Sequence, residues 1–241
     1  METFLVYLGL VGAVVLGGII VTYLHAANKN KFIKLMLSFS GGFLLAIAFT
    51  HFVPELYASE TKNIGLFILL GFLIQLVLEF FSGGIEHGHV HVHKGQKMPW
   101  GLFISLSAHS ILEGIPLGNQ YAGIEVGHHH GEHSLLFGIL FHQLPVAVAL
   151  MTLLLNTNIS KSKAWLILIA FGIMTPLGLT IGLISSTAAS FLDFNMILAI
   201  VVGMFLHIST TIIFETSENH KFNILKLTSI LIGCTLAFLM H

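Results

Sequence analysis

The sequence predicts an all-α polytopic membrane protein, a bundle of eight transmembrane helices with both termini outside. Of the 241 residues, 55% are hydrophobic and 9% are charged, whereas a soluble domain has roughly a quarter of its residues charged. Apolar stretches long enough to cross a bilayer fill most of the chain. These stretches are joined by short connections, which predicts one domain over residues 1–241.

Eight apolar stretches are predicted to span the membrane, with ends uncertain by a few residues. The first is not a cleavable signal, because no basic stretch precedes it and it is long enough to cross. Prolines inside later stretches do not argue against helices, because membrane helices tolerate them. The predicted spans are 3–24, 35–56, 63–82, 100–118, 134–155, 164–185, 194–214 and 222–240.

The lysines predict the orientation, because the chain has ten of them and no arginine. Only Lys62 follows an even-numbered span. The other nine lie in or beside the connections after spans one, three, five and seven: Lys29, Lys31, Lys34, Lys94, Lys97, Lys161, Lys163, Lys221 and Lys226. Basic connections remain in the cytoplasm, so this alternation places that face inside and both termini outside.

Span four contains a histidine and a carboxylate at helical spacing. His109 and Glu113 are four residues apart and therefore share one helix face. A carboxylate near the bilayer centre costs at least a few kcal/mol and needs a partner. The two could close on a divalent cation, or they could simply satisfy each other.

Span five adds a second histidine at a matching depth. An antiparallel arrangement of spans four and five would bring His142 level with His109 and Glu113. Two histidines and one glutamate form the ligand set of open zinc sites. In span two, His51 and Glu55 share a face near the outer surface, where they are either entry ligands or an ordinary interfacial pair.

Further candidates lie toward the cytoplasmic face. Glu79 is near the inner end of span three, beyond Gln75, and Glu215 is near the inner end of span seven, beyond His207. The connection after span three carries His87, His89, His91 and His93, and residues 128–133 on the outer side are also histidine-rich. Such tracts bind borderline divalent metals, although either could be an idle loop.

Several motifs together resemble the ZIP family of divalent-metal (zinc/iron) transporters, in particular its bacterial members. They are HSILEGIPLG in span four, HQLPVAVAL in span five, HFVPEL in span two and TPLG in span six. The resemblance covers nearly the whole chain. It implies inward movement of Zn²⁺, or of Fe²⁺, Mn²⁺, Co²⁺ or Cd²⁺, through a site between spans four and five, and it implies a homodimer.

The chain departs from the family pattern at span five. That motif commonly has a glutamate four residues after the histidine, where this chain has Val146. Many bacterial relatives hold a second metal with a polar residue after each histidine and a carboxylate before the span-six proline, where this chain has Ser110, Gln143 and Thr175. The His-Glu often found in span seven corresponds to Thr210-Thr211. These departures predict that the second site is absent or weak.

The sequence therefore predicts a multi-pass plasma-membrane transporter (inner membrane in a Gram-negative cell) whose partners are divalent metal ions and the bilayer. No catalytic residue, resident cofactor or nucleic-acid partner is expected. Ser110 and Gln143 are included among the candidate metal-site residues. The alternatives are an intramembrane zinc-dependent hydrolase and a transport-impaired metal-sensing relative. The sequence contains no H-E-x-x-H motif, which argues against the hydrolase.

Overall fold

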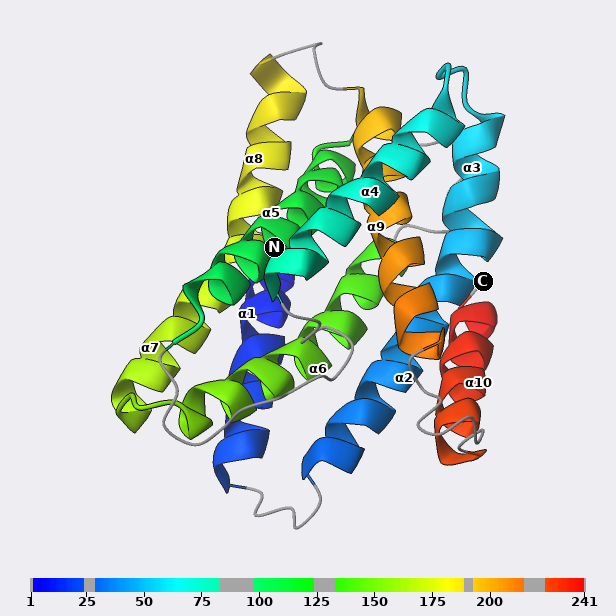
Figure 1. The fold of residues 1–241 in the computed structure, drawn as a ribbon. Helices are drawn as coiled ribbons and strands as arrows, with labels where there is room; N and C mark the ends of the chain where they lie inside the picture. The colour runs from blue at the N-terminus through cyan, green and yellow to red at the C-terminus, as the bar shows by residue number, and fades with distance from the viewer. Residues whose placement is uncertain are drawn as a thin grey trace.

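The computed structural model describes residues 2–23, 29–82, 98–123, 133–188, 193–214 and 224–240. The described part is helical and contains no strand, which confirms the all-α prediction (Figure 1). The helices are α1 (Glu2–Tyr23), α2 (Lys29–Ile47), the π-helix η1 (Ala48–Phe52), α3 (Val53–Ala58), α4 (Ile64–Ser82), α5 (Trp100–Tyr121), α6 (Ser134–Asn156), α7 (Lys161–Gly172), α8 (Met174–Ala188), α9 (Phe194–Phe214) and α10 (Ile224–Leu239).

Each of the eight predicted spans coincides with a helical stretch. Six stretches in the described residues are long and apolar enough to cross a membrane, and Ile224–Leu239 is a shorter apolar helix. The remaining stretch is α5, whose buried side includes several polar groups, among them His109 and Glu113. The chain is therefore a multi-pass membrane protein, and the one predicted span whose helix is not apolar enough for this criterion contains two of the three predicted central ligands.

Two predicted spans are not uniform α-helices, because prolines interrupt them. In span two, Pro54 has no N–H to bond with the carbonyl four residues earlier, and the preceding turn widens into η1 before α3 continues. In span six, Pro176 removes the same bond to Gly172, which is the last residue of α7. The chain resumes as α8 after Ile173.

Close helix pairs organise the bundle. The most extensive contacts join α5 to α8, α2 to α10, α4 to α9 and α1 to α6. Between α5 and α8 the backbones touch directly. A Cβ on Gly118 would lie 2.0 Å from the Leu179 carbonyl oxygen, and one on Gly182 would lie 2.1 Å from that of Ile115. Small residues therefore allow this approach, and they fix the depth and rotation of α5.

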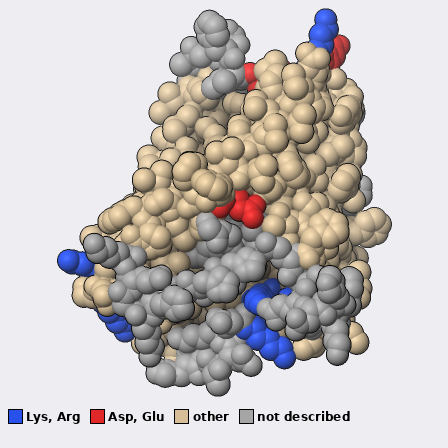
Figure 2. Space-filling view, viewed as in Figure 1, with Lys and Arg blue, Asp and Glu red and all other residues tan. Residues whose placement is uncertain are grey.

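The two ends of the bundle differ in charge. At one end Tyr23, which closes α1, lies under Lys161 at the start of α7, with 5.7 Å from Nζ to the ring centroid. The α10 and α2 starts meet at the same end, where Ser229 Oγ donates to the Leu35 carbonyl at 3.0 Å. Lysine side chains gather at this lower end in Figure 2, apart from the basic group at the upper corner. The charge pattern fits the predicted orientation, which itself stays a prediction.

Candidate metal centre

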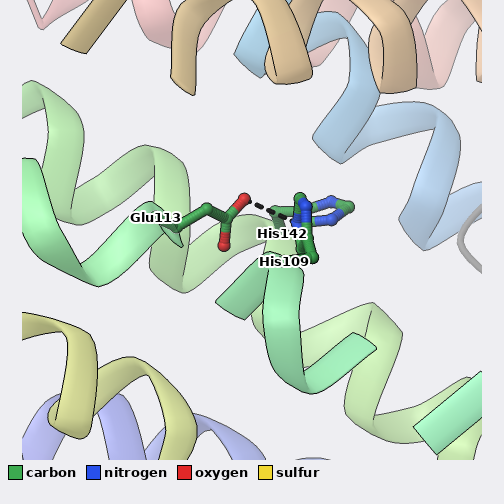
Figure 3. A group of neighbouring side chains, drawn as sticks. All are labelled: His109, Glu113 and His142. Carbon is green, nitrogen blue, oxygen red and sulfur yellow. Dashed lines mark ion pairs between the residues drawn. The ribbon is translucent and has the colours of Figure 1, made fainter. Parts of the chain in front are cut away.

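Three side chains that could hold a metal ion meet inside the bundle, from two helices that make few contacts with each other. His109 and Glu113 come from α5 and His142 from α6 (Figure 3). Their ligand atoms all lie within 4.8 Å of one another. The exposed fractions of His109, Glu113 and His142 are 3%, 2% and 2%, so the cluster is closed to solvent. Among the described residues this is the only group of its kind.

Helical spacing and packing both contribute to this meeting. His109 Nε2 lies 2.8 Å from Glu113 Oε1, as their four-residue separation predicts. The rings of His109 and His142 meet edge to face, with centroids 5.8 Å apart. Because α5 packs mainly on α8, and α6 on α1, the two ligand helices touch only sparsely. Their neighbours therefore set the separation between the ligands.

Each ligand histidine is held from behind by a helix that carries no ligand of the cluster. His109 Nδ1 lies 2.9 Å from Gln75 Oε1 on α4. His142 Nδ1 lies 3.2 Å from Ser40 Oγ on α2. Sequence reasoning did not assign either residue to the site. The available signal was a polar residue in an otherwise apolar span, which is weak without knowledge of the helix neighbours.

The hydrogen bonds determine which groups face the centre. A carbonyl oxygen such as Gln75 Oε1 can only accept, so His109 donates its Nδ1 hydrogen to it. A neutral His109 then directs the Nε2 lone pair at the Glu113 carboxylate, only 2.8 Å away. Two acceptors at this distance repel unless a cation lies between them. The arrangement therefore binds either a proton or a metal ion.

The positions at which the family resemblance implies a second metal carry neutral groups here. Gln143 Nε2 donates to Thr175 Oγ1 at 3.1 Å, and Gln143 Oε1 is buried with no hydrogen-bond partner among the described residues. Ser110 is 3% exposed and adds only a hydroxyl. Val146 is buried and belongs to an apolar cluster with residues such as Leu106 and Leu150. Glu113 is thus the one carboxylate of this region among the described residues.

The predicted entry ligands lie apart from the central cluster. His51 occupies the π-helix and Glu55 follows in α3. Thr50 Oγ1 donates to the Ala46 carbonyl at 2.8 Å and lies 2.9 Å from His51 Nδ1. Because the hydroxyl hydrogen is already used, His51 donates from Nδ1 and its Nε2 carries the lone pair. The structure does not bring this pair into the same group as His109.

Toward the predicted cytoplasmic face, Glu79 contacts His207, which was not among the predicted metal ligands. Its Oε2 forms a short ion pair with His207 Nε2 of α9, and Phe72 packs edge to face on the His207 ring. The remaining predicted ligands, Glu215, His87, His89, His91 and His93, lie outside the described residues.

The comparisons with known proteins agree with one another. The sequence model of the family described as ZIP zinc transporter matches residues 82–241. The chain is 26% identical to zinc transporter ZIP3 of Bos taurus over 218 residues, covering 66% of this chain and 68% of that protein. It is 26% identical to protein zntD of Dictyostelium discoideum over 165 residues and 30% identical to zinc transporter ZIP1 of Danio rerio over 104 residues.

The extent of the last two matches is smaller. They cover 62% and 43% of this chain but only 23% and 32% of the zntD and ZIP1 proteins. The family match, in contrast, includes the central cluster and every helix from α5 to α10. It assigns the chain to metal-ion transport and excludes an enzyme, so the hydrolase alternative is set aside. The chain belongs to the ZIP zinc transporter family.

Proposed function

We propose that this chain moves a divalent transition metal, with zinc as the preferred ion, into the cytosol through a site formed by His109, Glu113 and His142. The observation that supports this most is the convergence of three buried ligand atoms within 4.8 Å. Two histidines and one glutamate leave a coordination position open, as zinc sites that exchange ligands do. The names of two of the relatives above, zinc transporters ZIP3 and ZIP1, agree with zinc as the substrate. Fe²⁺, Mn²⁺, Co²⁺ and Cd²⁺ remain as alternatives, because imidazole and carboxylate ligands also suit several of them.

The charge of the centre favours transport over storage. A divalent cation next to one carboxylate leaves a net charge of +1 inside the bundle, and burial of that charge is costly. Binding should therefore be weaker than in a site with two carboxylates. An ion that is bound less tightly can leave more readily, which conduction requires.

The proposal includes a path on both sides of the centre. His51 and Glu55 would guide the ion in at the outer end, and Ser110 and Gln143 would supply neutral oxygens beside it. Glu79, Glu215 and the tract of His87, His89, His91 and His93 would receive it on the cytoplasmic side. A plasma-membrane location and a homodimer stay predictions from the family resemblance.

The test is zinc uptake into proteoliposomes containing the purified chain. We expect His109→Ala and Glu113→Gln to abolish uptake nearly completely, because each removes a ligand. Glu60→Gln is the matched control, since this carboxylate is exposed and does not belong to the cluster. Absence of uptake by the unaltered chain, with zinc still bound, would instead favour a metal-sensing relative.

The direction requires a separate measurement. Single cysteines, Gly95→Cys and Gly127→Cys, can be placed in a Cys234→Ala background and labelled on intact cells with an impermeant reagent. We expect the reagent to label position 127 and not position 95. The reverse pattern would overturn the orientation and with it the inward direction.

A further inference from the structure

The structure assigns to Gln75 a role in positioning His109 for the metal, an inference that rests on the proposed function. Gln75 is a polar residue in the largely apolar helix α4, and it is fully buried. Gln75 is not one of the three candidate ligands. Its Oε1 lies 2.9 Å from His109 Nδ1, whereas His109 Nε2 is the ring nitrogen next to Glu113.

This contact has a chemical consequence for the ligand. As long as Gln75 accepts from Nδ1, the Nδ1 hydrogen stays on that side, and only Nε2 can exchange a proton for a metal ion. The bond also limits rotation of the ring, which must direct Nε2 toward Glu113. Partners of this kind orient metal-ligating histidines and make them more basic, and their loss costs about 10–100-fold in metal affinity.

The second ligand histidine shows the same relation independently. Ser40 Oγ lies 3.2 Å from His142 Nδ1, and Ser40 is fully buried on α2. Both holding residues thus come from helices outside the α5–α6 pair, and both contact Nδ1. The candidate centre thus has three ligands from α5 and α6. Behind its two histidine rings lie two buried polar side chains, Gln75 of α4 and Ser40 of α2.

A purely structural role for Gln75 would be to connect α4 to α5, and the chain offers a matched control for that role. Ser105 on α5 donates its hydroxyl to the Leu78 carbonyl on α4, so it joins the same two helices without contacting a ligand. Ser105 is also buried, with 2% of its surface exposed. Ser105→Ala should therefore weaken the helix contact and leave His109 as it is.

The experiment is calorimetric titration of zinc into the purified full-length chain in detergent, with thermal unfolding of the same samples. Gln75→Leu removes the acceptor at nearly constant volume, and we expect zinc affinity to fall about 10–100-fold. Gln75→Glu retains an acceptor oxygen, and we expect it to bind zinc at least as tightly as the unaltered chain. Ser105→Ala should lower the unfolding temperature with little change in affinity.

A double variant tests whether Gln75 acts through His109. In a His109→Ala background we expect Gln75→Leu to have no further effect on zinc affinity. An unchanged affinity in Gln75→Leu, together with a loss in His109→Ala, would overturn this inference alone. An unchanged affinity in His109→Ala would overturn the proposed metal centre itself. A loss in Gln75→Leu that Ser105→Ala reproduces would reduce Gln75 to a helix contact.

Discussion

Within the described residues, two histidine–glutamate pairs lie inside the bundle, and only one of them belongs to a group that could hold a metal ion. His109 and Glu113 are joined by a third candidate ligand, His142, and all three are buried. Glu79 and His207 also form an ion pair, but Phe72 packs on the histidine ring and the Glu79 side chain is 19% exposed. The chemistry of each pair is the same, whereas its surroundings differ.

The difference teaches that a histidine and a carboxylate together do not suffice for a metal centre. A histidine and a carboxylate can satisfy each other, as Glu79 and His207 do. A second histidine beside such a pair adds another ring nitrogen that can bind a cation. The open geometry of three ligands then suits zinc. Substitutions that remove the third ligand, add a carboxylate or disturb the neighbouring contacts test this difference between the two pairs.

Removal of the third ligand should have the largest effect. His142→Ala reduces the centre to a histidine–glutamate pair like the one between α4 and α9. We expect zinc affinity to fall by more than about 100-fold, because even the loss of outer partners reaches that size. Calorimetric titration measures it, with Glu60→Gln as the control, because Glu60 is exposed and does not belong to the cluster. Retained affinity would show that His109 and Glu113 bind zinc without His142.

Addition of a second carboxylate should shift affinity in the other direction. Val146 is one helical turn after His142, so Val146→Glu would direct a carboxylate at the ion. We expect roughly tenfold tighter binding and equal or slower turnover, from close charge pairing at intermediate dielectric. Without metal, the two carboxylates repel and one holds a proton near neutral pH.

Zinc must displace that proton, so affinity of the Val146→Glu variant should rise with pH more steeply than that of the unaltered chain. Zinc affinity and initial uptake rate, both measured against pH, check this. If neither the affinity nor its pH dependence changes, residue 146 does not face the ion, and the placement of the site between α5 and α6 needs revision.

A change in the packing behind α5 should affect the centre less. The Cβ of Gly118→Ala would overlap the Leu179 carbonyl at 2.0 Å, so α5 and α8 must move apart. We expect a loss of stability of about 1–3 kcal/mol, as for other overpacked contacts, and a several-fold lower zinc affinity. Thermal unfolding and titration measure these. Gly12→Ala is the control, since a Cβ there has nothing within 4 Å, and an equal response of both variants would contradict the argument.

Disruption of the other pair should affect zinc binding least. His207→Gln removes the partner of Glu79, and we expect a stability loss of about 1 kcal/mol, typical of polar contacts inside membranes. Zinc affinity at the centre should change by less than about threefold, because sites without shared partners are nearly independent. Titration of both His207→Gln and His142→Ala compares the two regions directly. An equal loss in both would place Glu79 and His207 in the same centre.

The sequence by itself determined the helical spans and the shared face of His109 and Glu113. Both depend on local properties, namely the length of each apolar stretch and the helical period. The bends at η1 and at Ile173 lie near prolines for the same kind of local reason. The level of His142 was also predictable, from the positions of two histidines within consecutive spans.

Only the tertiary structure decided which helices lie behind the ligands. Gln75 and Ser40 are 34 and 102 residues from the histidines they contact, and Glu79 is 128 residues from His207. Such contacts depend on the rotation and depth of each helix against its neighbours. Close backbone approach at glycines, as between Gly118 and Leu179, fixes those quantities. Hydropathy does not encode them, because a glycine that touches another helix and one that faces lipid look alike in the sequence.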